Sequence, residues 1–146
     1  MNLSGFEKIE IQATNGGKSY LTKRPYVTVS STSVGFSRKL VNDLHSPSQL
    51  AFYKGQKGTA NENKIAIVPV EEGGSQFLNS AKAHKECKKR VDLKNKQILQ
   101  LFQKDLLMGF GTYYLIDAEV KEDDDELFAI VDMSKAVEHK VEKHRG

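Results

Sequence analysis

Cysteine and tryptophan are nearly missing from this chain of 146 residues, which has one Cys and no Trp. Because Cys87 is the one cysteine, no disulfide can form within the chain, and a reducing compartment is the expectation. No run approaches the ~18 apolar residues that cross a bilayer, and the first residues, MNLSGFEKIEIQ, lack the apolar stretch of a secretory signal. We therefore expect a cytoplasmic protein that has no membrane partner.

The chain also lacks the short motifs that mark common enzymes and metal sites, such as G-x-S-x-G and H-E-x-x-H. TNGGKSY contains Gly-Lys-Ser, but Gln12 stands where a phosphate loop needs its first Gly, and a strand rather than a helix is expected to follow. His84 and Cys87 would need further ligands to hold zinc, and the acidic run KEDDDE lacks the Gly of a calcium loop. We predict no enzyme activity, no catalytic residue, no metal and no cofactor. A cysteine enzyme with His84 as its base and a weak cation site in the acidic run stay open as lesser alternatives.

Apolar residues are scarce, at 38% of the chain, while charged residues make up 28%. These values are typical of a small soluble domain that has much surface for its volume. The length of 146 residues fits one domain, so we predict a single domain over residues 1–146. The net charge of +3 permits nucleic-acid binding but is too small to argue for it.

Short runs of alternating apolar and polar residues predict a mainly β (α+β) protein. Asn15-Gly16 and Gly16-Gly17 suit a two-residue hairpin turn, which predicts an N-terminal hairpin over residues 6–22. Helical spacing occurs at 37–45, where Ser37 can cap the first turn, and at 96–107, where Asn95 can. The charged tail, residues 134–146, could form a short helix from Ser134. The remaining strands are expected at 26–31, 49–54, 64–70, 76–80, 112–120 and 126–133.

One apolar run nearly repeats, because KIAIVPV (64–70) returns 63 positions later as LFAIVDM (127–133). The same shift places residues 50–53 on 113–116 across a loop of the same length. We predict two copies of a strand–helix–hairpin unit, over about 26–72 and 76–133. The alternative is that any two hairpins rich in Val, Ile and Phe look alike. The predicted buried core is Leu40, Val41, Leu44, Phe52, Ile65, Ile67, Leu101, Phe102, Leu115, Phe128 and Ile130.

The stretch YVTVSSTSVGFSRKLVNDLHSPSQLAFYKG, continued by NKIAIVPVEE, resembles one unit of the AbrB/MraZ-like swapped-hairpin β-barrel family. Ser30-Ser31 stands where that family usually has a Pro, and Ser46-Pro47-Ser48 where it has Gly-Asp. The resemblance implies a small closed or partly open β-barrel in which two units interleave their hairpins. It also implies DNA binding through basic residues near the first strand and helix, which here would be Lys23, Arg24, Arg38 and Lys39.

The strongest electrostatic feature is KAHKECKKRVDLKNK, residues 82–96, because basic runs of this density commonly neutralise phosphates. The alternative is a solvated segment that balances the acidic hairpin at 122–126. The run has few aromatic residues among its cations, which gives base stacking little support. Its predicted nucleic-acid-binding residues are Lys88, Lys89, Arg90 and Lys94.

Two functional hypotheses follow from these patterns. The first is a non-enzymatic nucleic-acid-binding domain with DNA as its partner, such as a bacterial or phage transcriptional regulator or accessory protein. The second is a protein-interaction or assembly module without nucleic-acid binding, whose partner is another protein or a second copy in a homo-oligomer. Steep loss of DNA affinity with salt would separate the two, because only phosphate binding releases condensed counterions.

Overall fold

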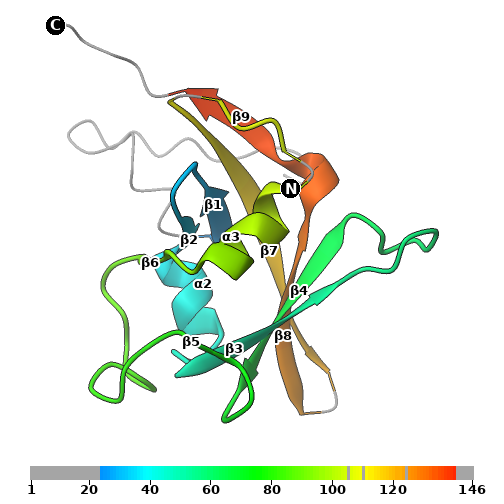
Figure 1. Ribbon diagram of the computed structural model, residues 1–146. Coiled ribbons are helices and arrows are strands. Elements are labelled where there is room, and N and C mark those ends of the chain that lie inside the picture. The colour runs from blue at the N-terminus through cyan, green and yellow to red at the C-terminus, as the bar shows by residue number, and fades with distance from the viewer. Residues whose placement is uncertain (1–23, 105, 110, 124, 141–146) are drawn as a thin grey trace, which may run out of the picture.

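One curled β-sheet, open like half a barrel, forms the body of the protein (Figure 1). The structure is a computed structural model that describes residues 24–140 except positions 105, 110 and 124. In this part of the chain the strand order is β5-β3-β4-β8-β7-β1-β2-β6, with β9 also on β7. The strands are β1 (Tyr26–Val29), β2 (Val34–Phe36), β3 (Gln49–Lys54), β4 (Lys64–Val70), β5 (Ser75–Gln76), β6 (Val91–Leu93), β7 (Thr112–Asp123), β8 (Glu126–Asp132) and β9 (Val137–Lys140). The mainly β prediction is confirmed.

Two short amphipathic helices, as predicted, pack against the sheet, and none in the described part is long and apolar enough to cross a membrane. Helix α2 (Arg38–Asp43) begins at Ser37, whose Oγ accepts a hydrogen bond from the amide of Leu40 at 3.2 Å. Helix α3 (Lys96–Gln103) begins at Asn95, whose Oδ1 accepts from two amides of the first turn. Both predicted caps are therefore confirmed, and each satisfies backbone N–H groups that the helix itself cannot.

The long strand β7 connects the two halves of the sheet. Its first half pairs with β1 on one side and β9 on the other, and its second half pairs with β8. Ala118 faces Val131 and Leu115 faces Val137, so the β8–β9 chain advances six residues while β7 advances three. The extra residues form the 3-10 turn η2 (Met133–Lys135). The predicted tail helix from Ser134 is wrong, because β7 offers this segment an edge to pair with.

Asp132 holds this turn in place. Its Oδ1 accepts hydrogen bonds from the Ser134 hydroxyl at 2.6 Å and the Ser134 amide at 3.0 Å. The hydroxyl has the largest influence and lowers the pKa of Asp132 below its usual value; the amide, Lys135 and Lys64 act in the same direction, and desolvation opposes them. The ionised Asp132 therefore stabilises the folded state at pH values above the usual pKa of an Asp. This stabilisation is lost as the pH falls through the lowered pKa of Asp132.

The core lies on the inner side of the sheet beneath the helices. Six predicted core residues are buried there, namely Leu40, Val41, Leu44, Ile65, Ile67 and Phe102. Phe52 and Leu101 are half-buried at its margin. On β7 and β8 the prediction is wrong, because Leu115, Phe128 and Ile130 are half-buried on the outer face. The buried apolar residues of these strands are Tyr114, Ile116, Ala118, Ala129 and Val131. A shift of one residue along a strand exchanges its inward and outward faces. Both faces of this hairpin carry apolar residues, so the sequence pattern does not show which face is inward.

The predicted repeat of one unit after 63 residues is wrong for the same reason. A shift of 63 residues places the buried Ile65 and Ile67 on Phe128 and Ile130, which point outward. The hairpin loops also differ, since residues 55–63 separate β3 from β4 whereas only positions 124 and 125 separate β7 from β8. The two similar strands instead pair with each other, with Ala66 facing Ile130 and Ile67 facing Ala129.

The sheet is not a closed barrel of two units. β5 and β6 are consecutive along the chain, yet they lie at opposite ends of the strand order. The connection between them, residues 77–90, contains no strand that could close the gap. The predicted N-terminal hairpin at 6–22 lies outside the described residues.

Candidate nucleic-acid interface

The basic segment, residues 79–90, forms most of the connection between β5 and β6 and is fixed by side chains of the α2 region. Asn42 provides the main anchor: its Oδ1 accepts from the Cys87 amide at 2.7 Å, and its Nδ2 donates to the Cys87 carbonyl at 2.9 Å. One side chain thus satisfies both backbone groups of Cys87, as a neighbouring strand would. The half-buried Cys87 packs against the core at this point.

Ser46 provides the second anchor. Its Oγ donates to the carbonyl of Lys85, and its own carbonyl accepts from the amide of His84 at 2.7 Å. Ser46 is buried, and it reaches this position because the chain leaves α2 in the left-handed conformation, with φ of 65° at His45 and 49° at Ser46. The backbone of the basic segment is therefore held against the protein, and its long side chains are left to project into solvent.

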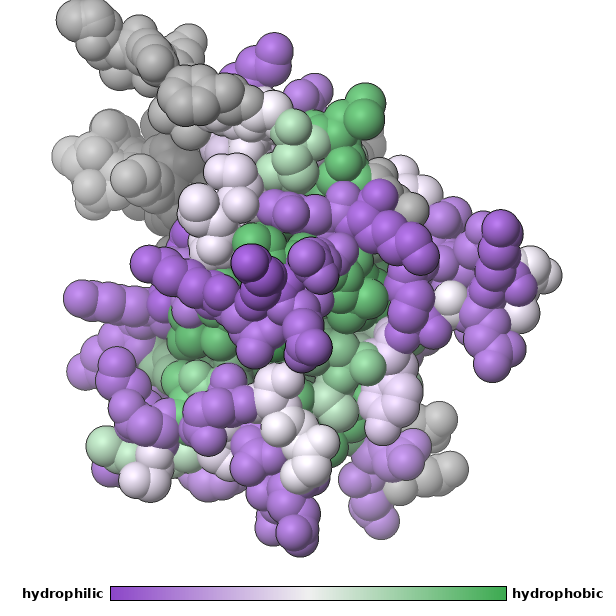
Figure 2. Space-filling model, in the orientation of Figure 1, coloured by the Kyte–Doolittle hydropathy of each residue, from purple (hydrophilic) through white to green (hydrophobic). Residues whose placement is uncertain are grey.

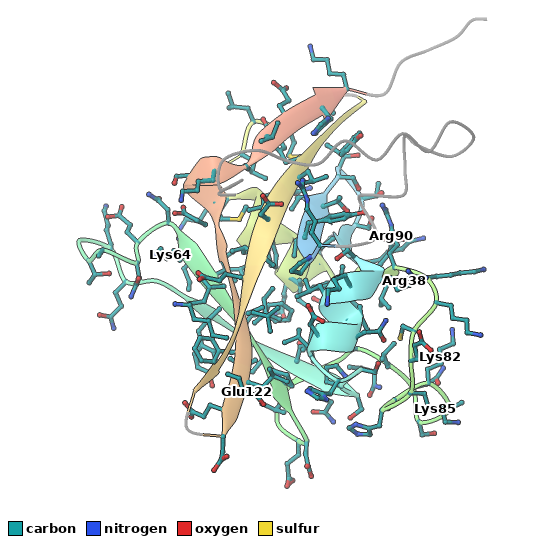
Figure 3. All side chains as sticks on the ribbon, turned by 180° about the vertical axis from the view of Figure 1, so that it is seen from behind. Arg38, Lys64, Lys82, Lys85, Arg90 and Glu122 are labelled. Carbon is teal, nitrogen blue, oxygen red and sulfur yellow. The ribbon has the colours of Figure 1, made fainter. Side chains whose placement is uncertain are left out.

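Four lysines of the basic segment are exposed, and none of them makes an ion pair within the described part of the chain: Lys82, Lys85, Lys88 and Lys89. In Figure 3, Lys82 and Lys85 lie along one margin of the molecule with Arg38 and Arg90. Figure 2 shows hydrophilic side chains projecting along this margin. A cavity of about 580 Å³ lies among these lysines, lined also by Phe77 and Leu78 and by two acidic residues, Glu86 and Asp92.

Three other predicted site residues are paired with carboxylates of the protein itself. Arg90 contacts Asp92 Oδ1 through Nε at 3.1 Å and Nη2 at 3.0 Å. Lys39 lies 2.8 Å from Asp43, and Arg24 lies 3.2 Å from Asp117. Exposed ion pairs of this kind are weak, so a phosphate can compete with the carboxylates for these cations. Breaking each ion pair nevertheless reduces the net free energy of binding.

The remaining predicted residues are spread more widely. Lys94 is exposed at the far end of β6, and Lys23 lies outside the described residues. Sequence reasoning included Lys82 and Lys85 in the basic run but not among the binding residues. In the sequence, only the local density of charge indicates Lys82 and Lys85. Their position on one margin with Arg38 follows from the way the basic segment packs on the protein (Figure 3).

The acidic hairpin does not neutralise this margin. Glu122, near the end of the β7–β8 hairpin, lies away from the labelled cations Arg38, Lys82, Lys85 and Arg90 in Figure 3. Its described neighbours make no ion pair with the basic segment. Among the described residues, the acidic hairpin therefore leaves the lysines of the basic segment unpaired.

Among the described residues, no group of three or more His, Cys, Asp or Glu side chains could hold a metal ion. His84 and Cys87 do not belong to any such group. Comparison with protein-family models, with curated proteins and with solved structures finds no match to this chain. The resemblance to AbrB/MraZ-like units stays a prediction.

Proposed function

We propose that this chain is a non-enzymatic domain that binds nucleic acid through the basic segment. The observation that carries the proposal is the set of four exposed lysines that have no carboxylate partner among the described residues and whose backbone is anchored by Asn42 and Ser46. A fixed backbone reduces the ordering cost of binding, and each phosphate that a lysine neutralises releases counterions. Arg38, on the same margin, adds a planar group suited to a bidentate phosphate contact.

The test is to replace Lys88 and Lys89 by Gln and to measure DNA and RNA affinity by fluorescence anisotropy across a salt series. We expect weaker binding, by a similar factor for every base sequence, because phosphate contacts carry no sequence information. The slope of log K against log salt should become shallower by about 2, at ~0.9 for each lost phosphate contact with duplex DNA.

A matched control replaces Lys57 and Lys104, two exposed lysines outside the basic segment, and removes the same net charge. An equal effect of both double substitutions would mean that overall charge, rather than this segment, attracts the nucleic acid. Wild-type protein that binds neither DNA nor RNA at low ionic strength would rule the proposal out.

A different observation favours self-association as a second function. The outer face of β3, β4 and β8 carries an apolar patch, which we name the outer patch: Ala51, Tyr53, Ala66, Val68, Phe128 and Ile130. Tyr53 is 60% exposed there, and Tyr53 faces Ala66, which in turn faces Ile130. Contiguous apolar patches of this kind commonly mark interfaces.

We propose a second copy of the chain as the occupant of the outer patch. The patch is flanked on β7 by Lys121 and Glu119, which face Phe128 and Ile130, so that charges of both signs border it. Lys121 Nζ lies 3.9 Å from Glu119 Oε1 within the chain, and a two-fold interface that places Lys121 of one copy beside Glu119 of the other repeats this pairing twice. Sedimentation of the wild type should reveal a dimer, which Tyr53→Lys converts to monomer. A monomer at every concentration of the wild type would rule this out.

A further inference from the structure

The outer face of the other half of the sheet contains a hollow. The register aligns one residue from each of five strands across this face, in the order Asp92, Gly35, Thr28, Leu115 and Val137. Gly35 adds no side chain to that row, and the side chains of Asp92 and Thr28 close in on either side of it. A Cβ atom at Gly35 would lie 2.6 Å from both Asp92 Oδ1 and Thr28 Oγ1, so no larger residue fits without moving these groups.

A cavity of about 400 Å³ lies beside Thr28 and Leu115 of this row, between the β1–β2 turn and the start of β7. This volume falls within the range of small-molecule sites, about 300–1,000 Å³. Two tyrosines, one arginine and several hydroxyl groups line it, among them Tyr26, Tyr113, Arg90, Thr28, Thr112 and Ser30.

The tyrosines give the cavity flat apolar walls. Tyr113 is held by His139, its partner across β7 and β9, with the two rings stacked 5.1 Å apart at 12°. Thr28, on the same face as Tyr113, is buried, and its hydroxyl group makes no hydrogen bond with any described residue. An aromatic ring held in place, beside a hydroxyl group that is unpaired among the described residues, suits a flat, polar-edged ring such as a nucleobase.

Arg90 joins this cavity to the basic segment, because it lines both the cavity among the lysines and the cavity beside Thr28. Asp92 engages its Nε and Nη2. A guanidinium has five N–H donors, so others stay available for a phosphate or a base edge. A nucleic-acid strand whose phosphates contact Lys88 and Lys89 can therefore continue past Arg90 to the hollow.

We propose that the hollow beside Thr28 receives an unpaired base of single-stranded nucleic acid, stacked on the tyrosine walls while its phosphates lie on Arg90 and the basic segment. This inference rests on the proposed function and names its substrate class. A base within a duplex is covered by its neighbours on both faces, so it does not enter the hollow. Stacking also tolerates any base, because every base has a π face.

The test compares three ligands of about 15 nucleotides for the wild-type chain at one salt concentration: oligothymidine, the same strand without bases, and a duplex. Anisotropy gives the affinity, and quenching of tyrosine fluorescence reports stacking. We expect oligothymidine to bind about 10-fold more tightly than the abasic strand, the range that stacking of one base provides. Quenching should accompany the thymidine strand only.

Tyr113→Leu should reduce oligothymidine binding to the abasic level and leave abasic and duplex binding unchanged. Leu107→Ala, at a residue that is 86% exposed and lies outside both the hollow and the outer patch, is the control and should change none of the three. If Tyr113→Leu fails to fold, the comparison of thymidine with abasic strand on the wild type decides alone. Equal, salt-sensitive affinity for both strands overturns this inference but leaves the proposed function intact, whereas no salt-sensitive binding to any ligand overturns both.

Discussion

Phe102→Ala is expected to reduce the free energy of unfolding by about 3–5 kcal/mol, from lost transfer energy and the cavity left behind. Phe102 has 0% of its surface exposed, and its ring packs edge-on against Phe52 with centroids 5.9 Å apart. It is the largest buried side chain of α3, which Ile98 also anchors, so its loss weakens the packing of that helix on the sheet. Urea denaturation followed by circular dichroism measures the change.

Leu107→Ala provides the control, because Leu107 is 86% exposed shortly after α3. A surface substitution of this kind changes stability by about 0.5 kcal/mol or less. If Phe102→Ala and Leu107→Ala unfold at similar urea concentrations, α3 does not depend on Phe102 for its packing.

Asn42→Leu is expected to weaken nucleic-acid binding although every cation of the basic segment stays in the chain. The substitution removes both hydrogen bonds to the Cys87 backbone, and leaving such groups unpaired costs about 1–3 kcal/mol. The basic segment should then detach, which raises the ordering cost of binding. Hydrogen exchange at residues 79–90 measures the detachment, and anisotropy measures the loss of affinity.

Asn63→Leu is the matched control, since Asn63 is exposed and its side chain makes no hydrogen bond to a described residue. Asn42→Asp gives an intermediate case, because a carboxylate still accepts from the Cys87 amide but cannot donate to its carbonyl. Unchanged hydrogen exchange in Asn42→Leu would disprove the role of Asn42 as an anchor.

Local features of this protein were determined by the sequence alone. Ser37 and Asn95 begin the two helices because a cap depends on one side chain and the next few amides. The β3–β4 hairpin was predictable for the same reason, since Ile65 and Ile67 alternate with smaller residues over one short run. The density of lysines between residues 82 and 96 is likewise visible without a structure.

Only the tertiary structure decided features that join distant residues. Phe128 and Ile130 are as apolar as Ala129 and Val131, so their pattern could not reveal which face of β8 is inward; the register with β4 and β7 decided that. The tail became β9 because β7 had an edge to pair with.

The candidate site depended on tertiary structure most of all. The sequence predicts Arg90 as a binding residue because of its charge. In the structure, Asp92, two residues away, forms an ion pair with it. The hollow is formed by residues such as Thr28, Arg90 and Tyr113, which two different strands and a loop bring together. Spacing along the chain carries no signal for such a site, because its geometry exists only once β1, β2, β6 and β7 have paired.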